Sequence, residues 1–288
     1  MAFPSGRERR NMMEREYYRI PAELLGENGK IPLRVMETSE DVFRSMASMM
    51  ADCIRENNRE GRRTVLICPV GPVGQYAYFV EQVNRERLDL GRVWFFNMDE
   101  YLDGDTFIDS KIPLSFRGFM DREVYGRIDP ELLMPKDQRV FPDPADPAGT
   151  DRLLEELDGA DIAFGGIGIT GHLAFNEPRK DMTAAEFAAL PTRVLEIAPE
   201  TRAVNAAGEL GGALECMPAR CVTLGMKQIL GAGKLRLGVF RDWHRAVVRR
   251  AAYGEKTAEF PVTLAQEHPD ALILTNGNAA RLPFGGNG

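Results

Sequence analysis

The fold is decided by residues 64–74, which read Thr64-Val-Leu-Ile-Cys-Pro-Val-Gly-Pro-Val-Gly74. The first five side chains are apolar or β-branched and lack the polar alternation of a half-exposed strand, so they predict a strand that is buried on both faces. The prolines and glycines that follow predict a tight loop. The amphipathic segment from about Gln75 to Arg87 then predicts a helix. A buried strand, a short loop and a helix form the repeating unit of a parallel α/β sheet.

The same order of strand, turn and helix recurs along the chain. We expect further buried strands at 93–96, 161–164, 235–240 and 271–275. The first long helix is expected after Thr38, because Thr38 and Asp41 have the spacing of a capping box and apolar side chains follow at helical spacing. Together these elements predict a doubly wound α/β fold, with a mostly parallel sheet, helices on both faces and right-handed crossovers.

The domain organisation follows from shifts in composition. Residues 1–30 are polar, and we expect them to form an N-terminal surface extension. Residues 31–288 are expected to form a single domain, because no repeat or low-complexity linker divides them. A stretch near 104–150 is rich in aspartate and proline and is expected to be an insertion.

Charge and cysteine content exclude several classes of function. The chain carries 36 lysines and arginines against 43 aspartates and glutamates, a net charge of −7, so we expect neither a nucleic-acid nor a membrane partner. No stretch reaches the roughly 18 apolar residues of a membrane span, and the first residues lack the apolar run of a secretory signal. The four cysteines match no disulfide framework, and three histidines are too few for a histidine-rich metal centre. These features predict a cytoplasmic protein with reduced cysteines and no bound metal.

Three of the predicted strand ends carry unusual residues. They are the loop 69–74, the pair Asp99-Glu100, and a glycine-rich loop that precedes His172. In a doubly wound fold, ligands bind beyond the carboxyl ends of the strands, so these segments predict a site. Burial beside apolar walls would raise the pKa of Asp99 and make it a better proton acceptor. The alternative is that Asp99 or Glu100 only caps the next helix.

The glycine-rich loop reads Gly165-Gly-Ile-Gly-Ile-Thr-Gly171 and continues to Pro178. It superficially resembles a dinucleotide fingerprint, but His172 and Glu177 stand where that helix carries small and apolar residues, so we expect no organic cofactor. A lone histidine is more often structural than catalytic. The five-residue spacing of His172 and Glu177 nevertheless permits a hydrogen bond that tunes both pKa values. Two carboxylates and an imidazole suit enolisation beside a carbonyl carbon.

Two segments resemble the signatures of the glucosamine-6-phosphate deaminase (isomerase) family: Phe96-Asn-Met-Asp-Glu-Tyr101 and the run from Gly165 to Pro178. The similarity extends from about residue 33 to about residue 282. The neighbouring 6-phosphogluconolactonase branch shares the fold, but Ala174-Phe-Asn-Glu-Pro178 resembles the deaminases. The family includes monomers and hexamers, so the resemblance allows a homo-oligomer.

The resemblance implies a role for each acid–base residue. Asp99 matches the base that moves a proton between C2 and C1 of an opened sugar. His172 matches the imidazole that assists ring opening, and Glu177 matches its acidic partner. Thr170 stands where the family usually has aspartate or asparagine, so His172 is expected to be held less strongly as imidazolium. No metal or organic cofactor is implied.

The phosphate site departs from the family pattern at four positions. Pro72 and Val73 stand in a loop that normally offers backbone N–H groups and a hydroxyl. The family's phosphate-binding arginine aligns with Ala207, and its later lysine aligns with His244. Each change removes a donor or a positive charge. The residues expected to contact the substrate are Val70, Gly71, Pro72, Val73, Gly168, Gly171, Ala207 and His244.

These observations predict a sugar aldose–ketose isomerase or deaminase that acts on an opened hexose or hexosamine other than an ordinary 6-phosphosugar. One alternative is a true glucosamine-6-phosphate deaminase whose phosphate is held by substitute cations. The candidate cations are Arg179, Lys180, Arg241 and Arg245. A further alternative is a sugar-sensing domain without catalysis. The intact acid–base residues argue against it.

Overall fold

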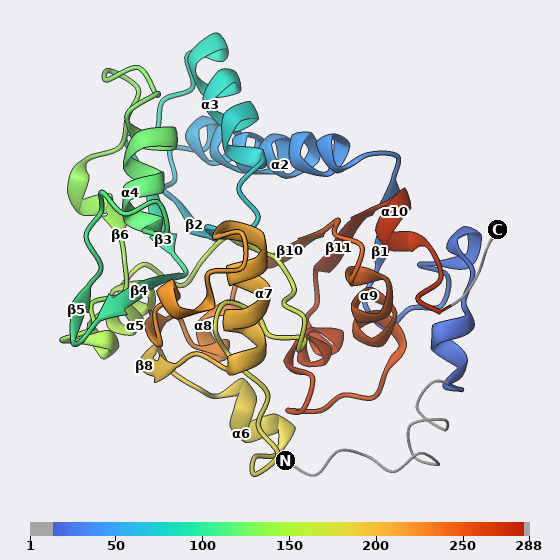
Figure 1. Ribbon diagram of the computed structural model, residues 1–288. Coiled ribbons are helices and arrows are strands. Elements are labelled where there is room, and N and C mark those ends of the chain that lie inside the picture. The colour runs from blue at the N-terminus through green and yellow to red at the C-terminus, as the bar shows by residue number, and fades with distance from the viewer. Residues whose placement is uncertain (1–13, 285–288) are drawn as a thin grey trace.

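A parallel sheet crosses the centre of the molecule (Figure 1). The computed structural model describes residues 14–284, and within them the sheet has seven strands in the order β1-β11-β10-β7-β2-β3-β6. In that order their bounds are Leu33–Met36, Ala271–Asn276, Lys234–Val239, Ile162–Gly165, Thr64–Cys68, Val93–Asn97 and Arg139–Val140. Every neighbouring pair runs parallel. The five strands predicted from sequence are all present, so the predicted sheet is confirmed.

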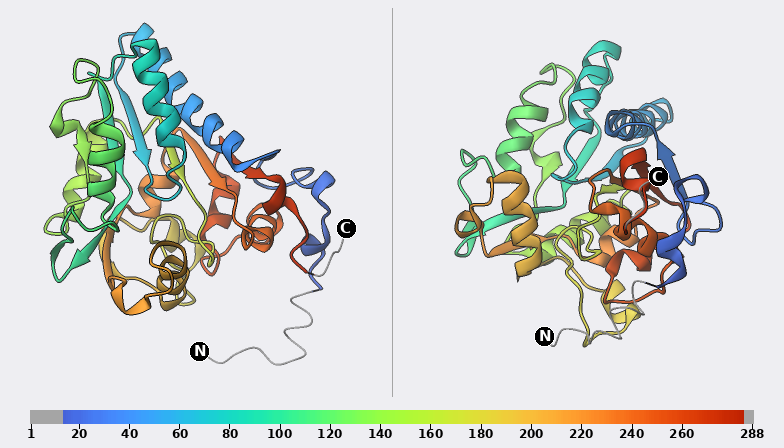
Figure 2. Two further views of the ribbon diagram at one scale, coloured as in Figure 1. Left: turned by 45° about the horizontal axis from the view of Figure 1, so that its top comes forward. Right: turned by 45° about the vertical axis from the view of Figure 1, so that its right-hand side comes forward.

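Helices cover both faces of this sheet. On one face lie α2 and α3, and on the other lie α5, α8 and α9, as Figure 1 and the two views of Figure 2 show. Their bounds are Ser39–Arg59, Gln75–Glu86, Pro147–Glu156, Met226–Leu230 and His244–Tyr253. Strand β2 is buried throughout and alternates between the two sides. Val65 and Ile67 pack on the α9 side, whereas Leu66 and Cys68 pack on the α2 side. The doubly wound α/β fold is therefore confirmed.

The capping box predicted before the first long helix is also present. The Asp41 N–H donates to Thr38 Oγ1 at 3.1 Å, and the Thr38 N–H donates to Asp41 Oδ2 at 3.0 Å. These two bonds satisfy backbone groups that the first turn of α2 cannot satisfy within the helix.

A second sheet, which the sequence did not reveal, lies beside the first. Its strands are antiparallel in the order β5-β4-β9-β8, with bounds Thr106–Phe107, Asp99–Asp103, Arg220–Thr223 and Arg193–Glu196. A small cluster that includes Tyr101, Phe175 and Cys221 packs against it. The chain passes from β3 to β4 at Met98, so Asp99 lies where the two sheets meet.

The remaining helical segments are short, apart from α7. They are α4 (Phe116–Met120), α6 (Ala184–Ala188), α7 (Pro199–Glu209), α10 (Gly277–Ala280), η1 (Glu16–Arg19), η2 (Ala22–Leu24), η3 (Asp121–Tyr125), η4 (Lys136–Gln138), η5 (Leu214–Cys216) and η6 (Pro261–Glu267). The stretch near 104–150 contributes β6 to the main sheet and begins α5, so it is an integral part of the fold rather than a separate insertion.

The N-terminal segment lies beside α9 and α10 in the views of Figures 1 and 2. Leu25 is buried in the main core. The fully buried guanidinium of Arg249 donates to the carbonyl of Ile20 and to carbonyls of the α10 end. The boundary at residue 30 remains a prediction, and residues 1–13 and 285–288 lie outside the described part of the chain.

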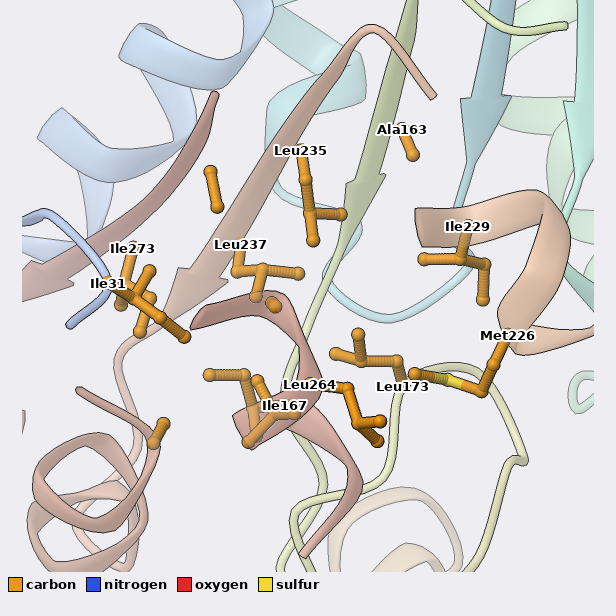
Figure 3. Packing of buried hydrophobic residues seen from close by; sticks show 14 of the residues in the cluster. Ile31, Ala163, Ile167, Leu173, Met226, Ile229, Leu235, Leu237, Leu264 and Ile273 are labelled. Atoms are coloured by element: carbon orange, nitrogen blue, oxygen red, sulfur yellow. The ribbon is translucent and has the colours of Figure 1, made fainter. Parts of the chain in front are cut away.

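The larger core fixes the glycine-rich loop that leads to the site. Figure 3 shows Leu235 and Leu237 of β10 pointing toward the η6 segment that carries Leu264. Ile167 and Leu173, on either side of the glycine-rich turn, are buried in the same cluster. This packing anchors both ends of the loop that carries His172. Between residues 14 and 284, none of the helices has the length and apolar character needed to cross a membrane.

Candidate active site

A cavity of about 500 Å³ opens at the carboxyl ends of β2, β3, β7 and β10. This is the edge at which doubly wound sheets bind ligands. Of the residues expected to form the site, those that line the cavity are Val70, Gly71, Pro72, Val73, Asp99, Gly168, His172 and His244. Those that do not line it are Thr170, Gly171, Glu177 and Ala207.

Asp99 begins β4 and lines the cavity. It is only 7% exposed, and among the described residues none donates a hydrogen bond to it. Burial, together with the neighbouring charge of Glu100, raises the pKa of Asp99 to about 8. An unpartnered carboxylate in such a place is a strong proton acceptor once it is ionised.

Glu100 points to the opposite side of the strand and performs the capping role. Its carboxylate accepts hydrogen bonds from the N–H of Phe116 at 3.1 Å, the N–H of Arg117 at 2.8 Å and Ser115 Oγ at 2.9 Å. Burial raises the pKa of Glu100, although these bonds oppose the shift. The alternative that this acidic pair caps a helix therefore applies to Glu100, while Asp99 lines the cavity.

His172 is held by a small polar network. Its Nδ1 lies 2.8 Å from Thr170 Oγ1 and 3.2 Å from Glu177 Oε2, and the Thr170 hydroxyl donates to Glu177 Oε2 at 3.0 Å. Because the threonine hydroxyl is committed to the carboxylate, Nδ1 carries the proton and donates. This arrangement leaves Nε2 as the ring nitrogen that can accept a proton.

Glu177 keeps its negative charge in this network. Burial raises its pKa, but hydrogen bonds from His172 and the nearby threonines outweigh burial, so its pKa lies below the ordinary value. Glu177 and Thr170 act on the cavity only through His172, since neither lines it.

Two glycines of the loop shape the site sterically. A Cβ on Gly168 would lie 2.0 Å from His172 Cε1 and Nε2, so only glycine lets the imidazole occupy its position. Gly171 has φ +82°, and a Cβ there would lie 2.6 Å from the ring of Phe260. Gly171 therefore allows the turn and its packing, and it does not contact the cavity.

The expected role of His244 as a substrate ligand needs correction. His244 lines the cavity, but its Nδ1 accepts the N–H groups of Phe240 at 3.2 Å and Arg241 at 2.9 Å, and its Nε2 lies 2.9 Å from the carbonyl oxygen of Ile167. Burial lowers the pKa of His244 to about 4, so the ring is neutral. Nδ1 thus holds the turn between β10 and α9, Nε2 connects the start of α9 to the glycine-rich loop, and neither nitrogen is free for an anion.

The other altered phosphate positions offer no charge either. Ala207 is exposed on α7, away from the cavity. The carbonyl of Pro72 accepts from Gln75 Nε2 at 2.7 Å, and the Val73 side chain, 39% exposed, is apolar. The cavity wall at these positions therefore lacks the hydroxyl and the cations of the family pattern.

Only one of the substitute cations reaches the cavity. Within residues 14–284, Arg241 lines it, and its guanidinium lies 3.7 Å from the carboxylate of Glu209, another lining residue. Arg179 pairs with Asp181 on the surface, and Arg245 donates to Asn278. Lys180 is exposed and does not line the cavity.

Sequence reasoning missed several lining residues. Thr201 Oγ1 lies 3.4 Å from His172 Nδ1, and Asn205 Nδ2 donates to the hydroxyl of Tyr101 at 3.1 Å. The four-residue spacing of Thr201 and Asn205 on one helix face was the signal available for them. Phe43 and Trp243 also line the cavity, and no local pattern marks them.

Among residues 14–284, no three histidine, cysteine, aspartate or glutamate side chains gather closely enough to hold a metal ion. The four cysteines are free thiols, and only Cys216 is exposed.

A doubly wound sheet whose acid and base residues converge on a cavity at the strand ends defines an α/β enzyme. No family model matches the chain. A glucosamine-6-phosphate deaminase from Mycoplasma mycoides is 26% identical to it over 251 residues, which cover 86% of this chain and 96% of the relative. Another from Thermoanaerobacter pseudethanolicus is 25% identical over 248 residues, covering 83% and 92%.

Solved structures agree on the fold. A monomeric glucosamine-6-phosphate deaminase of the NagB superfamily superposes with a TM-score of 0.75 at 24% identity, covering 86% of this chain and 98% of that chain. A 6-phosphogluconolactonase from Shewanella baltica superposes with a TM-score of 0.61 at 14% identity, covering 85% and 97%. The chain is thus similar over most of its length to curated glucosamine-6-phosphate deaminases, and it shares their fold.

Proposed function

We propose that this chain is an aldose–ketose isomerase, with deamination when the substrate carries an amine, that moves a proton between C2 and C1 of an opened hexose or hexosamine. The observation that carries the proposal is that a buried, unpartnered carboxyl group, Asp99, and an oriented imidazole, His172, line the same cavity. The similarity to glucosamine-6-phosphate deaminases supports the same class of chemistry.

Ring opening is assigned to His172. Nε2 accepts the proton of the C1 hydroxyl while the C1–O5 bond breaks, and the imidazolium then returns that proton to O5. Glu177 and Thr170 hold Nδ1 in the donating orientation and stabilise the imidazolium.

Proton transfer is assigned to Asp99. The ionised carboxylate removes the C2 proton, which the adjacent C1 carbonyl makes acidic, and the electron pair moves to O1 to form an enediolate or, with an amine at C2, the corresponding enolamine anion. The protonated carboxyl then delivers the proton to C1, while the C2 hydroxyl or amine gives up a proton to O1 and becomes a carbonyl or an imine. With a hexosamine, water adds to the resulting C2 imine and ammonia leaves, which yields the ketose.

The proposed substrate is not an ordinary 6-phosphosugar. Each charge-assisted hydrogen bond to a phosphate contributes roughly 1.5–3 kcal/mol, so losing three of them weakens binding by about four decades. The cation that remains in the lining, Arg241, already faces Glu209. A dianionic phosphate at Arg241 would also be repelled by the carboxylate of Glu209.

A second candidate rests on the same arginine. Because Arg241 lines the cavity, it is the residue that would bind the phosphate if this chain were a true glucosamine-6-phosphate deaminase. That activity requires Arg241 to leave Glu209 and bind the phosphate.

The test follows the C2 proton by NMR in D2O, with glucosamine as substrate and ammonia release measured in parallel. The expected result is loss of the C2 proton signal with the wild-type chain and none with Asp99→Asn. Equal exchange with both chains removes Asp99 from the mechanism. A cytoplasmic location and a sugar as the small-molecule partner remain part of the proposal.

A further inference from the structure

The cavity has an apolar end that the chemistry at Asp99 and His172 does not use. Phe43 from the start of α2 and Phe240 from the end of β10 meet with ring centroids 4.7 Å apart in an edge-to-face contact. Trp243, just before α9, packs on His244 with centroids 3.8 Å apart. Together with Val73 these side chains line the cavity, and we call Phe43, Val73, Phe240 and Trp243 the apolar end.

The polar side chains around the apolar end already have partners. His244 is neutral, and both of its nitrogens bond to backbone groups. The carbonyl of Pro72 accepts from Gln75. Arg241 lies against Glu209, and both side chains are about half exposed to solvent. A charged or strongly polar group placed at the apolar end would lose part of its hydration and would gain a side-chain partner only by drawing Arg241 away from Glu209, which is unfavourable.

The position of the apolar end relative to the reacting carbons follows from the strand order. Asp99 follows β3, His172 follows β7, and Phe240 follows β10, in the sheet order β3-β2-β7-β10. Neighbouring strands are about 4.8 Å apart, so the ends of β3 and β10 are separated by about 14 Å. Five carbon–carbon bonds of about 1.5 Å span less than about 8 Å. A six-carbon sugar whose C1 and C2 lie beside Asp99 and that extends toward β10 therefore ends short of Phe240.

We propose that the apolar end binds an uncharged apolar group, an alkyl or acyl chain of a few carbons, linked to O6 of the sugar. The proposal rests on the proposed function, because the position of C1 and C2 beside Asp99 sets the direction of the sugar. Such a group takes the place that a phosphate occupies on an ordinary 6-phosphosugar, and it gains affinity from burial rather than from charge.

The test is a homologous series of uncharged probes. Binding of 6-O-methylglucosamine, 6-O-butylglucosamine and glucosamine 6-phosphate is measured by calorimetry on the Asp99→Asn chain, so that turnover does not interfere. A buried methylene is worth about a fourfold change in Kd, so the three additional methylenes of the butyl ether lower Kd by up to about 60-fold. The phosphate is expected to bind more weakly than the methyl ether. Equal Kd values for the two ethers, tightest binding of the phosphate, or no binding of any probe overturns the proposal.

A charge-introducing variant gives an independent readout. Asp99→Asn/Val73→Lys is expected to lose most of the preference for the butyl ether and to bind the phosphate more tightly. The matched control is Asp99→Asn/Val35→Lys, because Val35 on β1 is 37% exposed, against 39% for Val73, and does not line the cavity. If the two variants show identical preferences among the probes, the apolar end does not bind the alkyl group and the proposal is overturned.

The two proposals fail in different ways. Absence of C2 exchange in the wild-type chain, with the butyl preference intact, overturns the proposed function and leaves the apolar end assigned. C2 exchange without any butyl preference overturns the apolar end and leaves the proton transfer in place.

Discussion

The rate of C2 proton exchange is expected to follow the ionisation of Asp99, and pH is the perturbation that changes it. Burial and the nearby charge of Glu100 raise the pKa of Asp99 to about 8. Only the ionised carboxylate accepts a proton. With that pKa, roughly 1% of Asp99 is ionised at pH 6, roughly half at pH 8 and roughly 90% at pH 9. The exchange rate is therefore expected to rise by about 90-fold between pH 6 and pH 9, and most of this increase is expected between pH 6 and pH 8.

The assay is kcat/KM for loss of the C2 proton of a hexose, which carries no amine, in D2O, followed by NMR across this pH range, because kcat/KM reports ionisations of the free enzyme and the free substrate. Asp103→Asn is the matched control. Asp103 lies at the exposed end of the same strand and does not line the cavity, so its variant is expected to keep the profile. A flat profile, or a midpoint near the ordinary carboxyl value of about 4, refutes the assignment of a buried base.

Three further predictions concern single residues. Because the pKa of Asp99 is raised in the folded state, the contribution of Asp99 to the free energy of unfolding is fully present below the pKa of the unfolded state and is lost as pH rises through about 8. The free energy of unfolding of Asp99→Asn, measured with urea at pH 9, is therefore expected to exceed that of the wild type, and a lower value contradicts the burial argument. Gly168→Ala places a Cβ 2.0 Å from the His172 ring and is expected to lower kcat for the ring-closed sugar about 100-fold with an unchanged circular dichroism spectrum, whereas full activity refutes the packing argument. His244→Ala leaves two N–H groups and a carbonyl without their partner and is expected to lower the free energy of unfolding by about 3 kcal/mol; unchanged stability would restore His244 as a candidate ligand.

The main sheet could be predicted because its strands carry an unmistakable signal. Strands such as Thr64–Cys68 are buried on both faces and end in proline- and glycine-rich loops. The antiparallel sheet gave no such signal. Asp99–Asp103 begins and ends with aspartate, and its burial depends on β9 and α4, which come from distant parts of the sequence.

The site was predictable to the extent that it depends on strand ends. Asp99 and His172 follow β3 and β7, whose carboxyl ends face the same cavity. His244 shows the limit of that reasoning, because the sequence reveals an ionisable ring and not the backbone groups that bond to both its nitrogens. The apolar end was invisible because Phe43 and Phe240 meet only in the folded chain.

We propose that this chain retains proton transfer at Asp99 and has lost the phosphate site of its relatives. The most direct measurement is the ratio of kcat/KM for C2 exchange with glucosamine to that with glucosamine 6-phosphate, taken at pH 8 on the wild-type chain. We predict measurable exchange with both sugars and a ratio above one. A larger kcat/KM for the 6-phosphate, with the preference abolished by Arg241→Ala, would contradict the claim and identify a glucosamine-6-phosphate deaminase that binds phosphate through Arg241.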